Sequence, residues 1–248
     1  MSNPNSTIRS LRAAVSFLTV LPVANVDGSP GERLGRAYFP AIGAFIGLAA
    51  GAVFAVLSSV TTPLLAAAGG VAVLSILTGA MHLDGLADSA DGLLGGGDVT
   101  RRLEKMRDPR LGSFGVTAIV VVLLLEVAAI SAMSPARGLA ALVVAGALSR
   151  LATLSVVTFV PYVRPSGLGV AASEARHRGT DFVFGAATAA IVCAIDWRRA
   201  AIALPLVGLT ALGISTLARR RVGGATGDVC GATAELCQLA TLLVFAIR

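Results

Sequence analysis

The sequence predicts an all-α, polytopic membrane protein, a bundle of about six or seven transmembrane helices. First, 55% of its 248 residues are hydrophobic and only 14% are charged, whereas soluble proteins have roughly 45–50% apolar and about 25% charged residues. Second, the apolar residues gather in runs of about 20, the length that crosses a bilayer. Because no polar stretch looks long enough to bury its own core, we expect one domain spanning residues 1–248.

Seven apolar runs are candidate spans. Five have full length, at 37–58, 63–82, 114–134, 138–160 and 200–217, and two are shorter, at 182–196 and 231–247. The apolar stretch in the N-terminal segment 1–35 is brief and ends at Pro22, which favours a helix on the membrane surface or only partly inserted.

Small residues in the first span predict close helix packing. Gly43, Gly47 and Gly51 recur every four residues. This spacing places them on one face of a helix, where the missing side chains let a neighbouring helix approach.

The basic residues are distributed unevenly between the two sets of loops. Loops on the N-terminal side hold most of the 20 lysines and arginines, whereas the other side has only Arg137, Arg198, Arg199 and Arg248. The positive-inside rule therefore places the N-terminus on the cytoplasmic face. Scattered in short loops, these arginines form no basic face for nucleic acid, so we expect no nucleic-acid partner.

Acidic residues concentrate in one segment on the predicted cytoplasmic side. Asp84, Asp88 and Asp91 follow one another at the spacing i, i+4, i+7, which on a helix places them on one face within roughly 60°. Three such carboxylates repel one another unless they share a cation. Glu104 and Asp108, again four apart, would meet the same cation.

The same segment, residues 83–113, supplies bases beside the acids. Arg101, Arg102, Lys105 and Arg110 are suited to phosphate oxygens. Cation, bases and a carboxylate that accepts a proton are the parts of a phosphoryl-transfer site. Hard oxygen ligands favour Mg²⁺ or Mn²⁺ over zinc. A solvated, salt-bridged connector is the alternative, but it does not require six of the fourteen acids in one stretch.

A second polar cluster, residues 218–235, lies on the same predicted face. Asp228 and Glu235 are seven apart and would align on one helix. Glycines at 223 and 224 would let backbone N–H groups approach a phosphate. The alternative is an ordinary helix start capped by Thr226 or Asp228.

Three arginines leave two interpretations each. Arg150 falls inside an apolar span, so it must face the bundle interior and pair, for example with Glu126, or contact a substrate. For Arg164 and Arg178, in the loop after the fourth full-length span, we favour a solvated position over phosphate binding.

At these residues the sequence resembles the cobalamin synthase family, the adenosylcobinamide-GDP ribazoletransferases. The resemblance covers most of the chain and rests on Phe17–Pro22, His82–Gly92, Arg102–Asp108, Gly112–Gly115, Pro161–Tyr162 and Gly223–Asp228.

The resemblance implies a multi-pass enzyme of the bacterial or archaeal cytoplasmic membrane that acts in the last steps of cobalamin biosynthesis. A hydroxyl of α-ribazole, or of its 5′-phosphate, would attack the cobinamide-linked phosphate of adenosylcobinamide-GDP and release GMP, with Mg²⁺ (or Mn²⁺) as cofactor. The expected metal ligands are Asp84, Asp88, Asp91 and Asp228, and the expected catalytic acids are Glu104 and Asp108. The expected substrate-binding residues are His82, Arg101, Arg102, Lys105, Arg110, Thr226 and Glu235.

Two other functions are weighed against this one. A CDP-alcohol phosphotransferase has an aspartate motif that Asp88–Gly92 echoes, but its second acidic pair comes later in the chain. A cation or proton transporter also places acids near spans, although usually in mid-membrane and in repeated halves. A homo-oligomer is compatible with either function.

Overall fold

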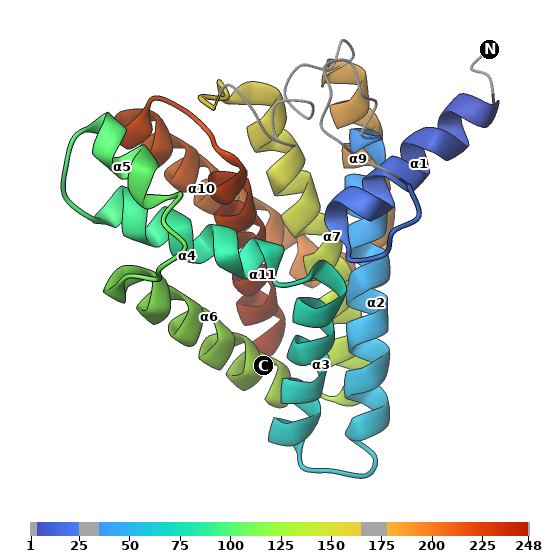
Figure 1. Cartoon of the computed structure of the whole chain (residues 1–248). Coiled ribbons are helices and arrows are strands. Elements are labelled where there is room, and N and C mark those ends of the chain that lie inside the picture. Colours follow the sequence, from blue (N-terminus) through green and yellow to red (C-terminus); the bar gives the residue numbers. More distant parts are fainter. Residues whose placement is uncertain (1–3, 25–34, 165–177, 248) are drawn as a thin grey trace.

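The computed structural model describes residues 4–24, 35–164 and 178–247, and these are almost entirely helical (Figure 1). The elements are α1 Pro4–Leu18, η1 Arg36–Tyr38, α2 Phe39–Leu57, α3 Pro63–Thr78, α4 Met81–Leu94, α5 Val99–Lys105, α6 Ser113–Ser131, α7 Pro135–Phe159, α9 Arg178–Cys193, η2 Ala194–Asp196, α10 Trp197–Val222 and α11 Gly227–Ala246. The all-α, polytopic fold is as predicted.

Within the described ranges, five helical stretches are long and apolar enough to cross a membrane, or six if α3 and α4 together count as one broken span. The five are Arg36–Leu57, Ser113–Ser131, Pro135–Phe159, Gly179–Val222 and Gly227–Ala246. Helix α1 is not among them, in keeping with the expected surface or partly inserted helix, and its Phe17 ring stacks on Phe39 with centroids 5.5 Å apart. The sequence predicted about six or seven spans, so the count of six, with α3 and α4 taken as one broken span, agrees with that prediction.

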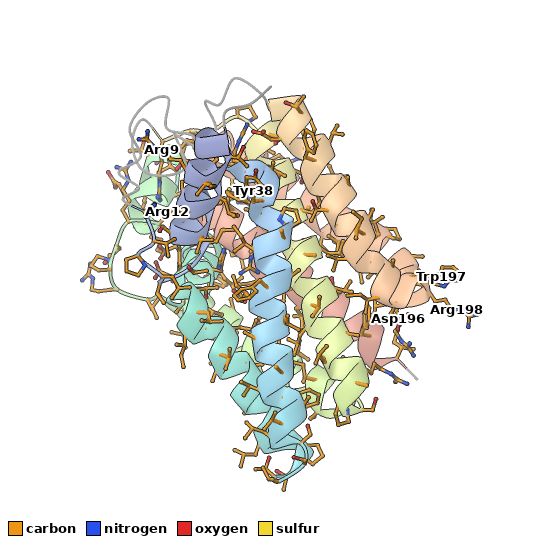
Figure 2. All side chains as sticks on the ribbon, turned by 90° about the vertical axis from the view of Figure 1, so that its right-hand side faces the viewer. Arg9, Arg12, Tyr38, Asp196, Trp197 and Arg198 are labelled. Atoms are coloured by element: carbon orange, nitrogen blue, oxygen red, sulfur yellow. The ribbon has the colours of Figure 1, made fainter. Side chains whose placement is uncertain are left out.

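The stretch Gly179–Val222 turns back on itself at η2. Near its first residues, Asp181 pairs with Arg36, just before α2, and near its last residues Arg219 donates to the carbonyl oxygen of Phe159, at the end of α7. Asp196 in η2 lies at the opposite end of the bundle from these two contacts (Figure 2). Its carboxylate is close enough to Arg137 for an electrostatic interaction. Helices α9 and α10 therefore run in opposite directions, as the two separate candidate spans implied.

Helices α2 and α7 form the central pair of the bundle. A Cβ added at Gly43 would overlap the carbonyl oxygen of Gly146, and one added at Gly47 would overlap that of Leu142. The two backbones thus touch where the small residues recur, which confirms the close packing predicted from Gly43, Gly47 and Gly51. Most of α7 is buried inside the bundle.

The run predicted as one span over 63–82 is broken near its end. Helix α3 stops at Thr78 and α4 begins at Met81, and their axes differ by 88°. Gly79 (φ 60°) and Ala80 (φ 56°) both adopt the left-handed conformation that turns the chain. As a result α4 leaves the direction of α3 and lies across the bundle (Figure 1). At 14 residues with three aspartates, α4 is an element at the end of the bundle and no span of its own.

Candidate active site

The acidic stretch forms helix α4, which crosses the start of α11 at two glycines. A Cβ added at Gly85 would lie 2.9 Å from the carbonyl oxygen of Asp228 and 3.1 Å from the Cα of Gly231. Only glycine permits this approach of the two backbones. The crossing brings Asp228, 144 positions further along the chain than Asp84, to the acidic face of α4.

Asp84 and Asp88 of α4 and Asp228 of α11 form the centre of the site. Asp84 is exposed, Asp88 is half-buried and the side chain of Asp228 is 15% exposed. Burial, followed by the charges of Asp228 and Asp84, raises the pKa of Asp88 to about 7. Carboxylates that raise one another's pKa lack sufficient counter-charge, which is the condition under which a divalent cation is favoured.

Arg164 is the basic residue that reaches this carboxylate cluster. Its Nη2 lies 2.6 Å from Oδ2 of Asp228 and also donates to the carbonyl oxygen of Met106 at 3.3 Å. The hydroxyl of Thr226 donates to the same Oδ2 at 3.3 Å and also caps α11. Thr226 therefore caps α11, as the alternative interpretation had it, and also contacts Asp228, whereas its predicted substrate contact stays a prediction.

A short backbone pairing places Arg164 beside Asp228. Tyr162 forms a parallel bridge with Ala225, in which Val163 N–H donates to Ala225 at 3.0 Å and Ala225 N–H donates to Pro161 at 2.8 Å. A solvated position was predicted for Arg164 because a contact with a residue over 60 positions away leaves no local pattern in the sequence. The one available signal was its place three residues after Pro161, which belongs to the Pro161–Tyr162 motif. The side chain of Arg178 lies outside the described part of the structure.

Asp91 is turned away from the centre of the site and caps helix α6. Its carboxylate accepts hydrogen bonds from the N–H groups of Gly112 at 2.6 Å and Gly115 at 3.0 Å. It is 5% exposed. A Cβ at either glycine would collide with this carboxylate, which explains the spacing of the Gly112–Gly115 motif. Asp91 thus has a structural task that the sequence did not reveal.

Arg102 is the second predicted site residue with a structural task. It is buried, and its guanidinium donates to four backbone carbonyl oxygens at the end of α4 and in the following turn, those of Gly92, Leu93, Gly95 and Gly97. These bonds satisfy the carbonyl groups that a helix end leaves without partners. Arg102 consequently fixes α5 against α4. Because its guanidinium is occupied by these carbonyl groups, Arg102 is not among the bases proposed to bind phosphate.

The predicted acids Glu104 and Asp108 lie outside the centre of the site. Helix α5 ends at Lys105, so the two are not on one helix face as the i, i+4 spacing implied. Glu104 is exposed, and Asp108 pairs with Arg110 at 2.8 Å. Hydrogen bonds from Arg110 lower the pKa of Asp108 to about 2, which makes Asp108 a weak base in this arrangement.

Exposed bases lie on α5 and directly after it. Arg101, Lys105 and Arg110 are all exposed, and the Nζ of Lys105 approaches Gly95, at the end of α4. Arg110 is held by its pair with Asp108, and Arg101 and Lys105 lie on α5, which follows the acidic helix. Their position suits the phosphate-binding role predicted for them.

His82 and Glu235 lie inside the bundle, in a buried polar network around Arg150. The guanidinium of Arg150 lies 3.5 Å from His82 Nδ1 and 3.4 Å from Gln238 Oε1, and Gln238 Nε2 donates to Glu126 Oε1 at 3.0 Å. Arg150 therefore faces the interior as expected, but it reaches Glu126 through Gln238. His82 and Glu235 are only 3% and 7% exposed. The substrate contacts predicted for them stay predictions, and the two residues are not part of the carboxylate cluster.

The donor set of the cluster suits a hard cation. Its ligands are carboxylate oxygens from two helices, the chemistry that Mg²⁺ and Mn²⁺ prefer. In the part of the chain that the structure describes, no three His, Cys, Asp or Glu side chains already converge on one metal position. Asp228 instead faces Arg164, so metal binding requires a rearrangement of this pair.

Comparisons with known proteins all match one family over nearly the whole length of this chain. A family model described as cobalamin-5-phosphate synthase matches residues 10–246. A protein of Stutzerimonas stutzeri named adenosylcobinamide-GDP ribazoletransferase is 42% identical over 96% of this chain and 98% of its own. Proteins of the same name from Bradyrhizobium diazoefficiens and Frankia casuarinae are 36% and 38% identical, covering 97% and 95% of this chain and 94% of each relative. No solved structure matches the chain.

Proposed function

Since the chain belongs to the cobalamin-5-phosphate synthase family, we propose that its α4–α11 cluster is the catalytic centre of an adenosylcobinamide-GDP ribazoletransferase. The reaction joins adenosylcobinamide-GDP to α-ribazole, or to α-ribazole 5′-phosphate, and releases GMP. The observation that carries the assignment is the meeting of Asp84, Asp88 and Asp228 at one end of the bundle, where Arg164 is the one base among residues 4–24, 35–164 and 178–247 found to offset their charge.

We propose that Asp84, Asp88 and Asp228 hold Mg²⁺, for which Mn²⁺ can substitute. When bound, the ion neutralises the charge that develops on the transferred phosphate. The capped carboxylate of Asp91 uses both oxygens for N–H groups of α6 and so supports the metal site mainly by fixing α6 against α4.

The residues around the cluster bind and orient the substrates. Arg101, Lys105 and Arg110 are proposed to hold the phosphates of the GDP moiety, since they are exposed beside α4. The attacking hydroxyl needs a carboxylate that accepts its proton. Of the two acids predicted for this role, both outside the centre of the cluster, Glu104 is free of the strong arginine pair that weakens Asp108, so we propose that Glu104 accepts the proton from a hydroxyl bound at the edge of the cluster.

The site is proposed to face the cytoplasm of a bacterial or archaeal cell, in the cytoplasmic membrane. The support is the distribution of bases. Helix α5 and the end of α10 carry arginines at the end of the bundle where the cluster lies, whereas Arg198 lies at the opposite end beside Asp196 (Figure 2), whose carboxylate also interacts with Arg137. The positive-inside rule then orients the chain. Water-soluble nucleotide substrates would reach the cluster from that side.

The test is a reaction with purified protein in detergent. Adenosylcobinamide-GDP, α-ribazole and Mg²⁺ should yield GMP and adenosylcobalamin, identified by mass spectrometry, and EDTA should stop the reaction until Mg²⁺ is restored. Replacement of the corrinoid by a CDP-activated lipid should give no product. Turnover of that lipid, with none of adenosylcobinamide-GDP, would favour the CDP-alcohol phosphotransferase instead. Ion flux in proteoliposomes that requires Asp88 would favour the transporter.

A further inference from the structure

Arg164 lies at the position where the carboxylates of Asp84, Asp88 and Asp228 require a positive charge. Its Nη2 lies 2.6 Å from Oδ2 of Asp228, and its positive charge favours the ionised carboxylate of Asp88, whereas the charges of Asp228 and Asp84 oppose it. Asp84, Asp88 and Asp228 would together carry three negative charges. With Arg164 the sum is negative by two, the charge that one divalent ion neutralises.

The guanidinium is only partly satisfied in this position. Nη2 bonds to Asp228 and to the carbonyl oxygen of Met106, whereas Nε is buried and has no hydrogen-bond partner in the part of the chain that the structure describes. A buried donor without a partner raises the free energy of the arrangement. A second acceptor, such as a phosphate oxygen, would satisfy it, because guanidinium binds phosphate through two parallel N–H groups.

The backbone supports such a change without unfolding. Arg164 follows the Tyr162–Ala225 bridge, which ties its Cα to the segment that leads into α11. Its side chain is 17% exposed, at the edge of the cluster. Rotation about the side-chain bonds is therefore enough to carry the guanidinium from Asp228 toward a ligand above the cluster, while the backbone stays in place.

We propose that Arg164 is an exchangeable counter-ion: it neutralises Asp228 in the metal-free enzyme, yields Asp228 to Mg²⁺, and then binds the diphosphate of the GDP-bearing substrate. This inference rests on the proposed metal site. It makes Arg164 a substrate-binding residue that also prevents the metal from binding tightly before the substrate arrives, so that metal and nucleotide bind cooperatively.

The proposal predicts opposite changes in two affinities. In Arg164→Gln, Mn²⁺ has no competing charge at Asp228, so its dissociation constant, followed by the EPR signal of free Mn²⁺, should fall roughly tenfold. The dissociation constant of GDP at saturating Mn²⁺, measured by calorimetry, should rise roughly tenfold, because the phosphate loses its guanidinium. Arg164→Lys, which keeps the charge but not the fork, should leave Mn²⁺ binding near wild type and still weaken GDP.

A matched control is available at the far end of the molecule. Arg199 pairs with Asp196 at 2.8 Å, and Asp196 lies at the opposite end of the bundle from the cluster (Figure 2). Arg199→Gln removes an arginine from a similar ion pair and should change neither affinity. This control separates a local effect at the cluster from a general loss of stability.

The outcomes distinguish this inference from the proposed function. If Arg164→Gln binds Mn²⁺ as wild type does, or more weakly, while wild type binds Mn²⁺ and turns over, the exchange is wrong and Arg164 is a structural partner of Asp228. If wild type turns over but binds no Mn²⁺, the metal site itself is wrong, and the inference fails with it.

Discussion

Three aspartates with the same helical spacing have different environments. Asp84 is exposed, Asp88 is half-buried beside Asp228, and Asp91 has both oxygens bonded to N–H groups of α6. The spacing alone assigns them one shared role. The structure separates a carboxylate that is open to a cation from one that holds two helices together, and substitutions should separate them as well.

Asp88→Asn should lower GMP release by roughly a hundredfold or more, because the metal loses a charged ligand and several kcal/mol of stabilisation with it. Membrane insertion and thermal stability should stay close to wild type, since the Asp88 side chain has no hydrogen bond to lose among the described residues. Asp196→Asn, at the other end of the bundle, is the control and should retain activity. Near-normal turnover of Asp88→Asn would remove Asp88 from the metal site.

Asp91→Asn, in contrast, should mainly lower the thermal stability of the protein. An amide presents an NH₂ group toward one of the two N–H donors, Gly112 or Gly115, so a charge-assisted hydrogen bond worth about 1.5–3 kcal/mol is lost. We expect a lower thermal transition in detergent, followed by fluorescence-detected size exclusion. A variant with full thermal stability and no turnover would show that Asp91 acts in catalysis rather than as a cap.

At the scale of elements, the apolar runs predicted nearly every helix but not the bend. The run over 63–82 continues without interruption in hydropathy, yet α3 ends at Thr78 and α4 departs at 88°. Gly79 is an ordinary signal for a helix end, whereas Ala80 adopts φ 56° without any signal in its own chemistry. The packing around the turn overrides the preference of alanine, and this information is not local.

The candidate active site, like the helices, could be predicted only in part from the sequence. The concentration of acids identified α4, and the motif order pointed to Asp228. The tasks of Asp91, Arg102 and Arg164 could not be predicted, because each depends on a contact made by the returning chain: the start of α6, the turn before α5, and the bridge to Ala225. Such contacts between segments leave little periodicity behind.

Gly85→Ala tests whether the crossing of α4 and α11 builds the site. The added Cβ would press on the backbone of Asp228 and Gly231 and force the helices apart, at a cost of about 1–3 kcal/mol. We expect turnover and Mn²⁺ affinity to fall together in an inserted protein. Gly208→Ala, at a helical glycine of α10 with open space around it, should keep both. Equal Mn²⁺ affinity in Gly85→Ala and wild type would separate the crossing from metal binding.

At the scale of the whole molecule, the fold predicts which residues face each side of the membrane. The exposed Thr100 belongs to α5 at the end that holds the site, whereas Ser59 is exposed in the turn between α2 and α3 at the opposite end (Figure 1). In the orientation proposed above from the positive-inside rule, the first end is the cytoplasmic one.

A cysteine at each of these positions, with the three native cysteines replaced by serine, gives a direct topology experiment. A membrane-impermeant maleimide added to intact spheroplasts should label Ser59→Cys at once and Thr100→Cys only after the membrane is permeabilised. Labelling in the reverse order would invert the chain and move the site to the outer face.

The central claim is that carboxylates of α4 and α11, far apart in the sequence, jointly bind the catalytic cation. The most direct measurement is an anomalous difference map from crystals of the protein grown with Mn²⁺ and GDP. We expect one or more peaks between Asp88 and Asp228, about 2.1–2.2 Å from carboxylate oxygens. A peak on Glu104 and Asp108 alone, with none at the crossing of α4 and α11, would contradict it.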